Sequence, residues 1–401
     1  MKQRKRRLLV VALFAVAALV AAACGDDDDT DGTTATTQPE NGTTTTTGDG
    51  EGGLVEGCEE GVTDPSDMSV GRKVARCEPG FPAPQPLPQM ETVRVSSAFR
   101  LEFNSPLLLA DTMGELEKEN LKMEFINLPF SDAVPQMADG RIDVAVGGIE
   151  IALFNAGHND LPVRAVLANY FPPHAGDYSV PQTGLWCRRD AFSNPDDPDL
   201  KEIEDMRLAT SVGRGSVSWY YVVEEIRRQG YPDFNLSDAD IQRIPSADTV
   251  AALQNNAIQC GILLDPVWTQ VKDDPNYFLA ATQTPGEPLG IYAYGKRLLE
   301  DRRDIGEAFA RAYIRTVNTY FNGDYHQDDE VMQEIAEVTG QPVEQLKQFD
   351  SLVMDWEFRE GTFQRVQEQY IDLGVITDFS EPVPDEKIVD TSFYLKAVGA
   401  Q

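Results

Sequence analysis

From residue 91 onward, short apolar segments alternate regularly with segments of helical periodicity, and this alternation constrains the fold more than any other feature. Strands are predicted at 93–98, at 121–127, where apolar and polar residues alternate, and at the buried apolar segments 142–148 and 163–170. Between them, residues 105–118 and 131–137 repeat apolar side chains at helical spacing. Strands separated by helices at this interval indicate parallel strands, each joined to the next by a crossover helix. We therefore predict an α/β fold.

The same pattern recurs later in the chain. Strands are predicted at 206–212, 241–244 and 260–264, with helices between them. A helix end, a polar turn and an apolar strand occur in that order at 135–148 and again, in outline, at 252–265. We interpret the two units as two lobes, although any strand–helix–strand unit looks similar. Further helices are predicted at 216–229, 247–256, 265–272, 303–321, 329–338, 343–352 and 359–371.

The start of the chain has the features of an export signal. A basic cluster precedes the apolar run 8–23, which is shorter than the roughly 20 residues of a spanning helix. The run ends in small residues directly before Cys24, as in a bacterial lipobox, although Ala21 replaces the usual large aliphatic residue. We expect residues 1–23 to be a lipoprotein signal peptide and Cys24 to carry lipid on the extracytoplasmic face of the cell membrane. An uncleaved anchor and ordinary cleavage beside an incidental cysteine are the alternatives.

Residues 24–53 are acidic, rich in threonine and glycine, and almost free of apolar side chains. Such a segment cannot offset the entropy of ordering, so we predict a disordered tether. Residues 54–90 contain cysteine and many prolines and are predicted to be irregular. The whole chain has 34 basic and 66 acidic residues, a net charge of -32. This balance argues against nucleic-acid binding, because phosphates would be repelled.

Four cysteines follow Cys24, and they allow three pairings. We favour Cys58–Cys77, which closes a small loop in a segment with little core of its own. Cys187 and Cys260 are then either a second pair or buried free thiols. The chain has no C-x-x-C motif and only three isolated histidines, so we expect no metal site and no cofactor.

Five passages occur in a specific order along the chain. They are VRVSSAFRLEFNSPLLLADTMGELEKENLKMEF (93–125), SDAVPQMADGRIDVAVGG (131–148), MRLATSVGRGS (206–216), ALQNNAIQCGILLDPVW (252–268) and DEKIVDTSFYLKA (385–397). In this order they resemble the substrate-binding proteins of ABC transporters for sulfonates, taurine, nitrate and thiamine-pyrimidine precursors. Asn256 and Gln259 stand where that family has Gly and Asp.

The resemblance implies a periplasmic-binding-protein-like clamp of two parallel-sheet lobes joined by crossing strands, with extra C-terminal helices. Lobe one would comprise 91–187 plus 290–401, and lobe two 188–289. The implied function is capture of a small polar organic solute, such as a sulfonate, a zwitterion or an amino-heteroaromatic compound. The solute would pass to an ABC permease. We expect a monomer with no catalytic residues.

Loops at the ends of the strands should face the ligand. The loop at Arg214 opens a helix, whose free N–H groups and positive end suit an anionic group. Glu150 follows an apolar strand and a glycine pair, where a solvated face has no special need of a carboxylate. Asp265 and Ser216 could equally be helix caps, Trp268 a core residue, and Arg214 a solvent-exposed side chain. The expected ligand-binding residues are Phe99, Asn104, Gly148, Glu150, Gly213, Arg214, Ser216, Asp265 and Trp268.

Two other functions compete with solute import. Some relatives of this family are enzymes that build the thiamine pyrimidine with a histidine and a cysteine-rich motif, and this chain has no such motif and only isolated histidines. It also lacks G-x-S-x-G, P-loop and H-E-x-x-H motifs. The second alternative is a sensor or scaffold lipoprotein that binds a ligand without transport.

Overall fold

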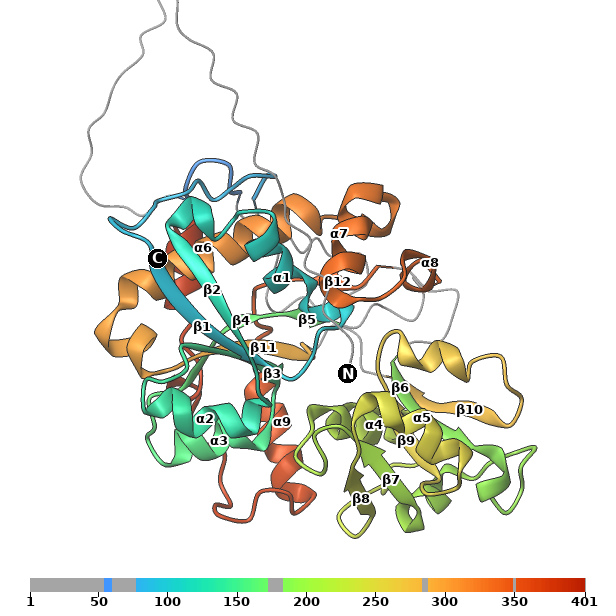
Figure 1. Cartoon of the computed structure of the whole chain (residues 1–401). Coiled ribbons are helices and arrows are strands. Elements are labelled where there is room, and N and C mark those ends of the chain that lie inside the picture. Colours follow the sequence, from blue (N-terminus) through green and yellow to red (C-terminus); the bar gives the residue numbers. More distant parts are fainter. Residues whose placement is uncertain (1–53, 60–76, 172–182, 283–287, 349–350, 401) are drawn as a thin grey trace, which may run out of the picture. The chain divides into compact units, whose positions relative to one another are not determined.

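The structure, a computed structural model, describes residues 54–59, 77–171, 183–282, 288–348 and 351–400. All of them belong to one of the two units into which the chain divides, Glu51–Gln401 (Figure 1). The predicted signal peptide, the predicted lipidation site Cys24 and the predicted tether 24–53 lie outside the described residues.

The first half of the strand–helix alternation forms a five-stranded sheet in the order β2-β1-β3-β11-β4. The central strand β3 reads VAVGG and is apolar along its first three residues, as expected for a strand covered on both faces. It is parallel to β1, while β11 returns from much later in the chain and runs antiparallel to β3 and β4. The strands are β1 (Glu91–Ser97), β2 (Leu121–Asn127), β3 (Val144–Gly148), β4 (Arg164–Ala168) and β11 (Gly290–Tyr294).

Helices cover both faces of this sheet. In Figure 1, α2 and α3 lie on one side of it, and α1 and α6 on the other. The long helix α6 is amphipathic and buries Ile305, Phe309 and Tyr313 in the core. The helices are α1 (Ser105–Thr112), α2 (Phe130–Ala138), α3 (Ile151–His158), α6 (Arg303–Tyr320) and α10 (Ser392–Val398).

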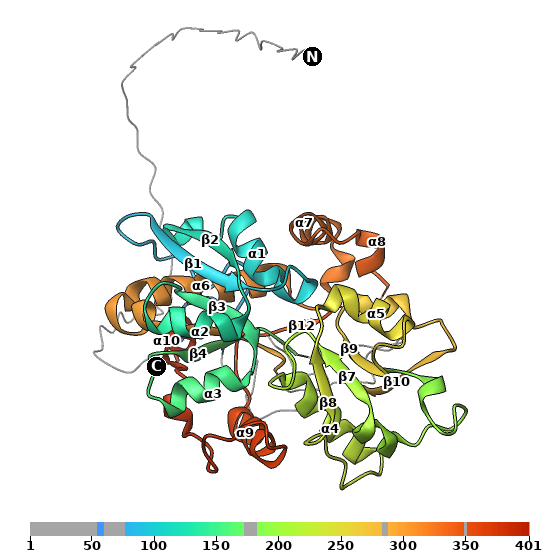
Figure 2. The same ribbon diagram turned by 60° about the horizontal axis from the view of Figure 1, so that its bottom comes forward.

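The second sheet also has five strands, in the order β10-β6-β9-β7-β8. Helices α4 (Val217–Arg228) and α5 (Ser246–Gln254) lie on opposite faces, and each covers a separate apolar cluster (Figure 2). The central strand β9 is parallel to β7 and antiparallel to β6. The strands are β6 (Gly184–Arg188), β7 (Arg207–Thr210), β8 (Asp240–Arg243), β9 (Cys260–Leu263) and β10 (Tyr277–Thr282).

Among the described strands, the chain goes from the first sheet (β4) to the second at β6 and back to the first from β10 to β11. Strand β6 pairs with β9 and β10, so the first passage ends before Gly184, a few residues ahead of the predicted lobe boundary at 187/188. The chain re-enters the first sheet at β11, which begins at Gly290. The predicted second segment of lobe one also begins at residue 290. A separate two-stranded antiparallel sheet pairs β5 (Tyr170–Phe171) with β12 (Val353–Met354).

Both disulfides are present. Cys58 is bonded to Cys77, and Cys187 is bonded to Cys260. The second disulfide joins facing positions of β6 and β9, so it is part of the core of the second sheet.

The described part of the 54–90 segment packs onto the first sheet's helices rather than standing apart. The guanidinium of Arg315 donates to the carbonyl of Pro82 at 2.9 Å and to Glu115 and Glu119 at 2.6 and 3.0 Å. Arg311 adds a 2.8 Å bond to the same Glu119. These four charged side chains are buried and form a closed cluster that fixes the segment to α6.

Several predicted helices are shorter in the structure. The helix predicted at 105–118 ends at Thr112, because Gly114 has a φ of 77°, which ends the helical turn. The helix predicted at 343–352 is limited to α8 (Val343–Leu346), and that at 265–272 to a 3-10 turn over Val267–Gln270. The other C-terminal helices are α7 (Asp329–Thr339) and α9 (Thr362–Asp372). No helix in the described ranges has the length and apolar character to span a membrane.

Candidate functional site

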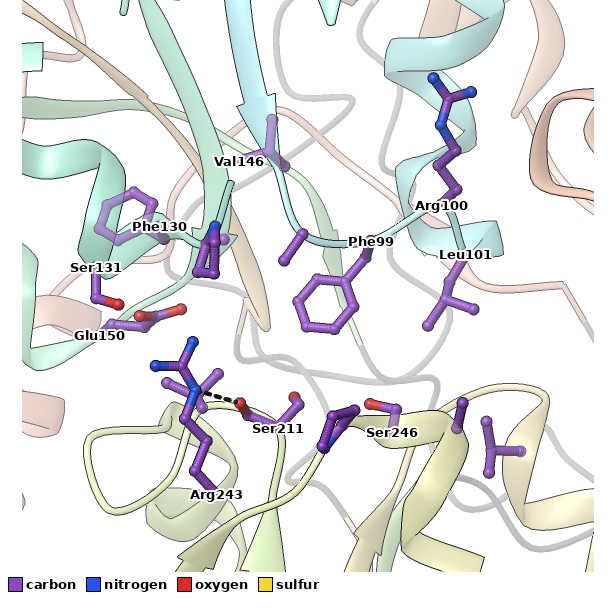
Figure 3. A pocket seen from close by; sticks show the side chains of 17 residues that line it. Phe99, Arg100, Leu101, Phe130, Ser131, Val146, Glu150, Ser211, Arg243 and Ser246 are labelled. Carbon is purple, nitrogen blue, oxygen red and sulfur yellow. Dashed lines mark hydrogen bonds between the residues drawn. The ribbon is translucent and has the colours of Figure 1, made fainter. Parts of the chain in front are cut away.

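A cavity of about 620 Å³ opens between loops of the two sheets (Figure 3). Every loop that lines it follows the carboxyl end of a strand, which is where open α/β sheets bind ligands. The first sheet contributes Ala98, Phe99, Arg100 and Leu101 after β1, Pro129, Phe130 and Ser131 after β2, and Val146, Gly147 and Glu150 from β3 and just beyond. The second sheet contributes Ser211 and Val212 after β7, Arg243 at the end of β8, Pro245, Ser246 and Ala247 just after it, and Val267 after β9.

Most of the lining is apolar, and one wall is fixed by close packing. A side chain at Gly147 would place its Cβ only 2.5 Å from the Cβ of Phe130, so glycine is required there for Phe130 to lie against β3. Phe99 makes an edge contact with Phe103, which stacks on Tyr170. These ring contacts fix the loop after β1. In Figure 3, Phe99 and Phe130 lie on opposite sides of Val146.

Glu150 is the buried carboxyl of the site, with only 4% of its surface exposed. It directly precedes α3, and its side chain points into the cavity (Figure 3). Burial raises the pKa of this carboxyl to about 8, because water is removed from the charged form. A hydrogen bond with the backbone of Gly148 and the positive charge of Arg243 oppose the rise, and Asp132 adds to it.

Arg243 faces Glu150 from the second sheet (Figure 3). Its Nε donates to the carbonyl oxygen of Ser211 at 3.1 Å. Within the described part of the chain, Arg243 and Glu150 form no ion pair with each other, although the charge of Arg243 influences the Glu150 pKa. The cavity therefore has an acidic and a basic group on opposite walls, with space between them.

Of the residues predicted from sequence, Phe99 and Glu150 line this cavity. Asn104 lies behind it and is fully buried. Its side-chain nitrogen donates to Ser97 Oγ at 2.8 Å and to the carbonyl of Phe99 at 2.9 Å, so it supports the loop that carries Phe99. Gly148 lies against Val217 rather than in the lining.

The predicted anion loop is used for internal contacts. The guanidinium of Arg214 donates to the carbonyls of Leu236 and Ser237 at 3.0 and 2.8 Å, and to that of Ala239. Ser216 accepts from the backbone N–H of Ser218 and caps α4. Gly213 has a φ of 83°, which suits glycine at this turn. This arrangement places Gly213, Arg214 and Ser216 outside the cavity lining.

Asp265 and Trp268 are also buried outside the lining. Asp265 accepts from the Thr183 hydroxyl at 2.6 Å and from the Trp268 indole N–H, so it joins the loop after β9 to the residue before β6. Burial raises the pKa of Asp265 to about 6, with a smaller contribution from the charge of Glu102, while these two hydrogen bonds oppose the shift. Trp268 is a core residue of the second sheet.

The end of β8 and the loop after it, which supply Arg243, Pro245 and Ser246, were not predicted as part of the site from sequence. A signal was available, because residues 241–244 were predicted as a strand and ligands bind at the carboxyl ends of such strands. Phe130 and Ser131 were missed for a similar reason. Among the described residues, no group of three or more His, Cys, Asp or Glu side chains could hold a metal ion.

No protein-family model and no curated protein matches the chain. Solved structures do match. The ligand-binding component of an ABC-type import system from Staphylococcus aureus is 16% identical, with a TM-score of 0.56 over 77% of this chain and 99% of that one. The alkanesulfonate-binding protein SsuA from Xanthomonas axonopodis pv. citri is 13% identical, with a TM-score of 0.57 over 75% and 99%.

The periplasmic nitrate-binding protein NrtA from Synechocystis PCC 6803 is 13% identical, with a TM-score of 0.55 over 78% of this chain and 89% of that one. These proteins are of the same class as the family that the sequence passages resemble. At such low identity the likeness concerns the fold, and it extends over nearly the whole length of each matched chain. The chain has the periplasmic-binding-protein fold.

Proposed function

We propose that this chain is an extracytoplasmic solute-binding protein that captures a small organic solute and delivers it to an ABC permease. The cavity between the strand ends of the two sheets carries this proposal. Its volume of about 620 Å³ falls in the range of roughly 300–1,000 Å³ that small-molecule sites occupy. The structural likeness to proteins named for sulfonate binding, nitrate binding and ABC-type import supports the same function.

The lining indicates the general chemistry of the solute. Apolar surface from Phe99, Phe130 and Val267 surrounds a small number of polar groups. Such a site binds the body of a ligand by burying apolar area and orients it through its polar ends. Sulfonates with an organic tail, zwitterions and amino-heteroaromatic compounds all meet this description.

The proposed lipid anchor suits this role. A lipidated Cys24 would supply the two or more acyl chains that stable membrane attachment requires. The tether 24–53 would then allow a monomer to reach a permease in the same membrane. In this proposal the chain binds and releases its solute chemically unchanged.

A binding screen tests the proposal. The full chain, purified in detergent, is heated with each member of a panel of sulfonates, nitrate, pyrimidines, amino acids and quaternary amines. A solute at about 100 times its dissociation constant adds about 2.7 kcal/mol to the free energy of unfolding, which raises Tm by about 4 °C for a folded part of this size. The solute is then recovered and identified by mass spectrometry.

A matched pair of variants locates the binding site. Phe99→Ala removes a ring from the cavity and should weaken binding at least tenfold. Phe379→Ala removes a ring that stacks on His158 away from the cavity, and it should leave the affinity unchanged. Solute uptake by cells that lack the protein separates transport from sensing. Uptake at the wild-type rate would favour a sensor or scaffold, and no binding by any compound would overturn the proposal.

A further inference from the structure

The two facing charges of the cavity suggest a narrower class of solute. We infer that the solute is a zwitterion of the amino-acid type, whose ammonium group contacts Glu150, whose acidic group contacts Arg243, and whose apolar body lies against Phe99 and Phe130. This inference rests on the proposed function, since it concerns the solute of the same cavity.

The first-sheet wall provides the site for the ammonium group. Glu150 is 96% buried, at the edge of a cavity whose neighbouring surface comes from Phe130 and Gly147. An ionised carboxylate in such a place needs a counter-charge, because its lost hydration is otherwise uncompensated. Ser131 lines the same cavity, and a serine hydroxyl can accept an ammonium N–H.

The second-sheet wall provides the site for the acidic group. Only Nε of Arg243 is used internally, in its bond to Ser211. Within the described ranges, its two terminal nitrogens have no hydrogen-bond partner, and the guanidinium faces the cavity (Figure 3). A planar guanidinium fits a carboxylate or sulfonate through two parallel hydrogen bonds.

The placement of Glu150 and Arg243 on opposite walls of one cavity is the central observation. A simple amine would leave the guanidinium of Arg243 without a partner, and a simple anion would leave Glu150 without an ammonium group to balance its ionised form. A zwitterion satisfies both in one molecule. It also has an apolar body available for the rings of Phe99 and Phe130, which would otherwise remain hydrated.

One other solute fits the geometry, and pH distinguishes the two. A protonated Glu150 could donate a hydrogen bond to an anion. Burial raises the pKa of Glu150 to about 8, and the groups that face it are Arg243 after β8, Asp132 on α2 and Tyr370 on α9. Anion binding through protonated Glu150 would weaken as the pH rises through this value. Ammonium binding to ionised Glu150 would strengthen.

The test uses the full chain in detergent and calorimetric titration with matched probes. The zwitterions are L-phenylalanine and 4-(aminomethyl)benzoate. Their counterparts without the ammonium group are 3-phenylpropionate and 4-methylbenzoate, and those without the carboxylate are 2-phenylethylamine and benzylamine. We expect one zwitterion to bind at least about tenfold tighter than both of its counterparts. For the aminomethyl probe, whose ammonium group resembles that of lysine, affinity should rise about tenfold or more between pH 6 and pH 8.5.

Two variants assign the contacts. Glu150→Gln keeps the shape of the side chain but removes its charge, so it should weaken zwitterion binding at least tenfold and abolish the pH dependence. Arg243→Gln is a change at an exposed residue and should weaken binding of every probe that has a carboxylate. The controls Glu337→Gln and Arg141→Gln alter exposed residues outside the cavity and should have no effect.

The results separate this inference from the proposed function. If a carboxylate without an ammonium group binds as tightly as its zwitterion, with an affinity that falls as the pH rises and survives Glu150→Gln, the inference is overturned and the solute-binding function stands. If a zwitterion binds but Arg243→Gln leaves its affinity unchanged, the inference is also overturned. If no probe and no member of the wider panel binds, both proposals are overturned.

Discussion

The buried carboxyl of Glu150 predicts a defined loss of stability as the pH rises. Its pKa is about 8 in the folded state, against an ordinary value of 4.5. The folded protein therefore holds this proton more tightly than the unfolded chain. Between the two pKa values, unfolding releases the proton. The contribution of Glu150 to the free energy of unfolding is thus complete below pH 4.5 and is lost as the pH rises through the folded-state pKa.

The size of this effect comes from the shift. One pKa unit corresponds to about 1.4 kcal/mol, so the contribution should fall by about 4 kcal/mol between pH 5 and pH 9. Solvent screening removes little of it, since only 4% of the residue's surface is exposed. Many other groups titrate over this range, and a reference variant is needed to cancel them. Glu150→Gln serves, because it has nearly the same shape and does not titrate.

Urea unfolding, followed by tryptophan fluorescence, gives the free energy of unfolding of both proteins from pH 5 to pH 9. We expect wild type minus Glu150→Gln to decline by about 4 kcal/mol, with most of the decline below pH 8. The control difference, wild type minus Glu337→Gln, should be flat. A Glu150 difference that stays constant within about 1 kcal/mol would refute the reasoning. It would mean that water reaches this carboxyl and that its pKa is near the ordinary value.

Two further variants probe parts of the structure away from the cavity. Arg315→Met should lower the free energy of unfolding in urea by about 3–5 kcal/mol, because it leaves Glu115 and Glu119 buried with too few partners; a loss below about 1 kcal/mol would contradict this account of the cluster. Arg214→Ala should lower stability by about 1–3 kcal/mol through its lost carbonyl contacts and leave solute affinity, measured by calorimetry, within twofold of wild type. A tenfold weaker affinity would place Arg214 at the solute after all.

The repeated part of the fold could be predicted from sequence because its strands alternate with crossover helices. β2, β3, β4, β7 and β9 fall within predicted strands, and β1 overlaps one. β3 and β9 were visible as short apolar runs, and the edge strand β2 through its alternation of apolar and polar residues. β6, β10 and β11 lack that context. They run antiparallel to their neighbours and return the chain between sheets, so only the three-dimensional pairing identifies them.

The candidate site was harder to predict, for a different physical reason. Glu150 was identified because its loop had a visible anomaly, a charge after an apolar strand and two glycines. Arg243 was not identified, because an arginine at a strand end is usually a solvated residue. Its place opposite Glu150 follows only from how the two sheets face each other across the cavity. Such facing depends on residues more than 90 positions apart, which no local pattern contains.

Arg214 and Arg243 differ in how many of their hydrogen-bond donors are already used within the protein. Arg214 lies next to a helix start, where an anion site is expected, yet backbone carbonyls of the neighbouring loop occupy its guanidinium. A group whose hydrogen bonds are already made gains little from a solute, because any new contact must first break an old one. Among the described residues, Arg243 keeps its two terminal nitrogens unused, and the buried carboxyl of Glu150 has no cation in contact. The free energy that a solute can supply is therefore greatest between these two residues. Both arginines are charged, but of the two, within the described part of the chain, only Arg243 has both terminal nitrogens unused. We therefore expect Arg243 to bind the solute and Arg214 to stabilise the fold.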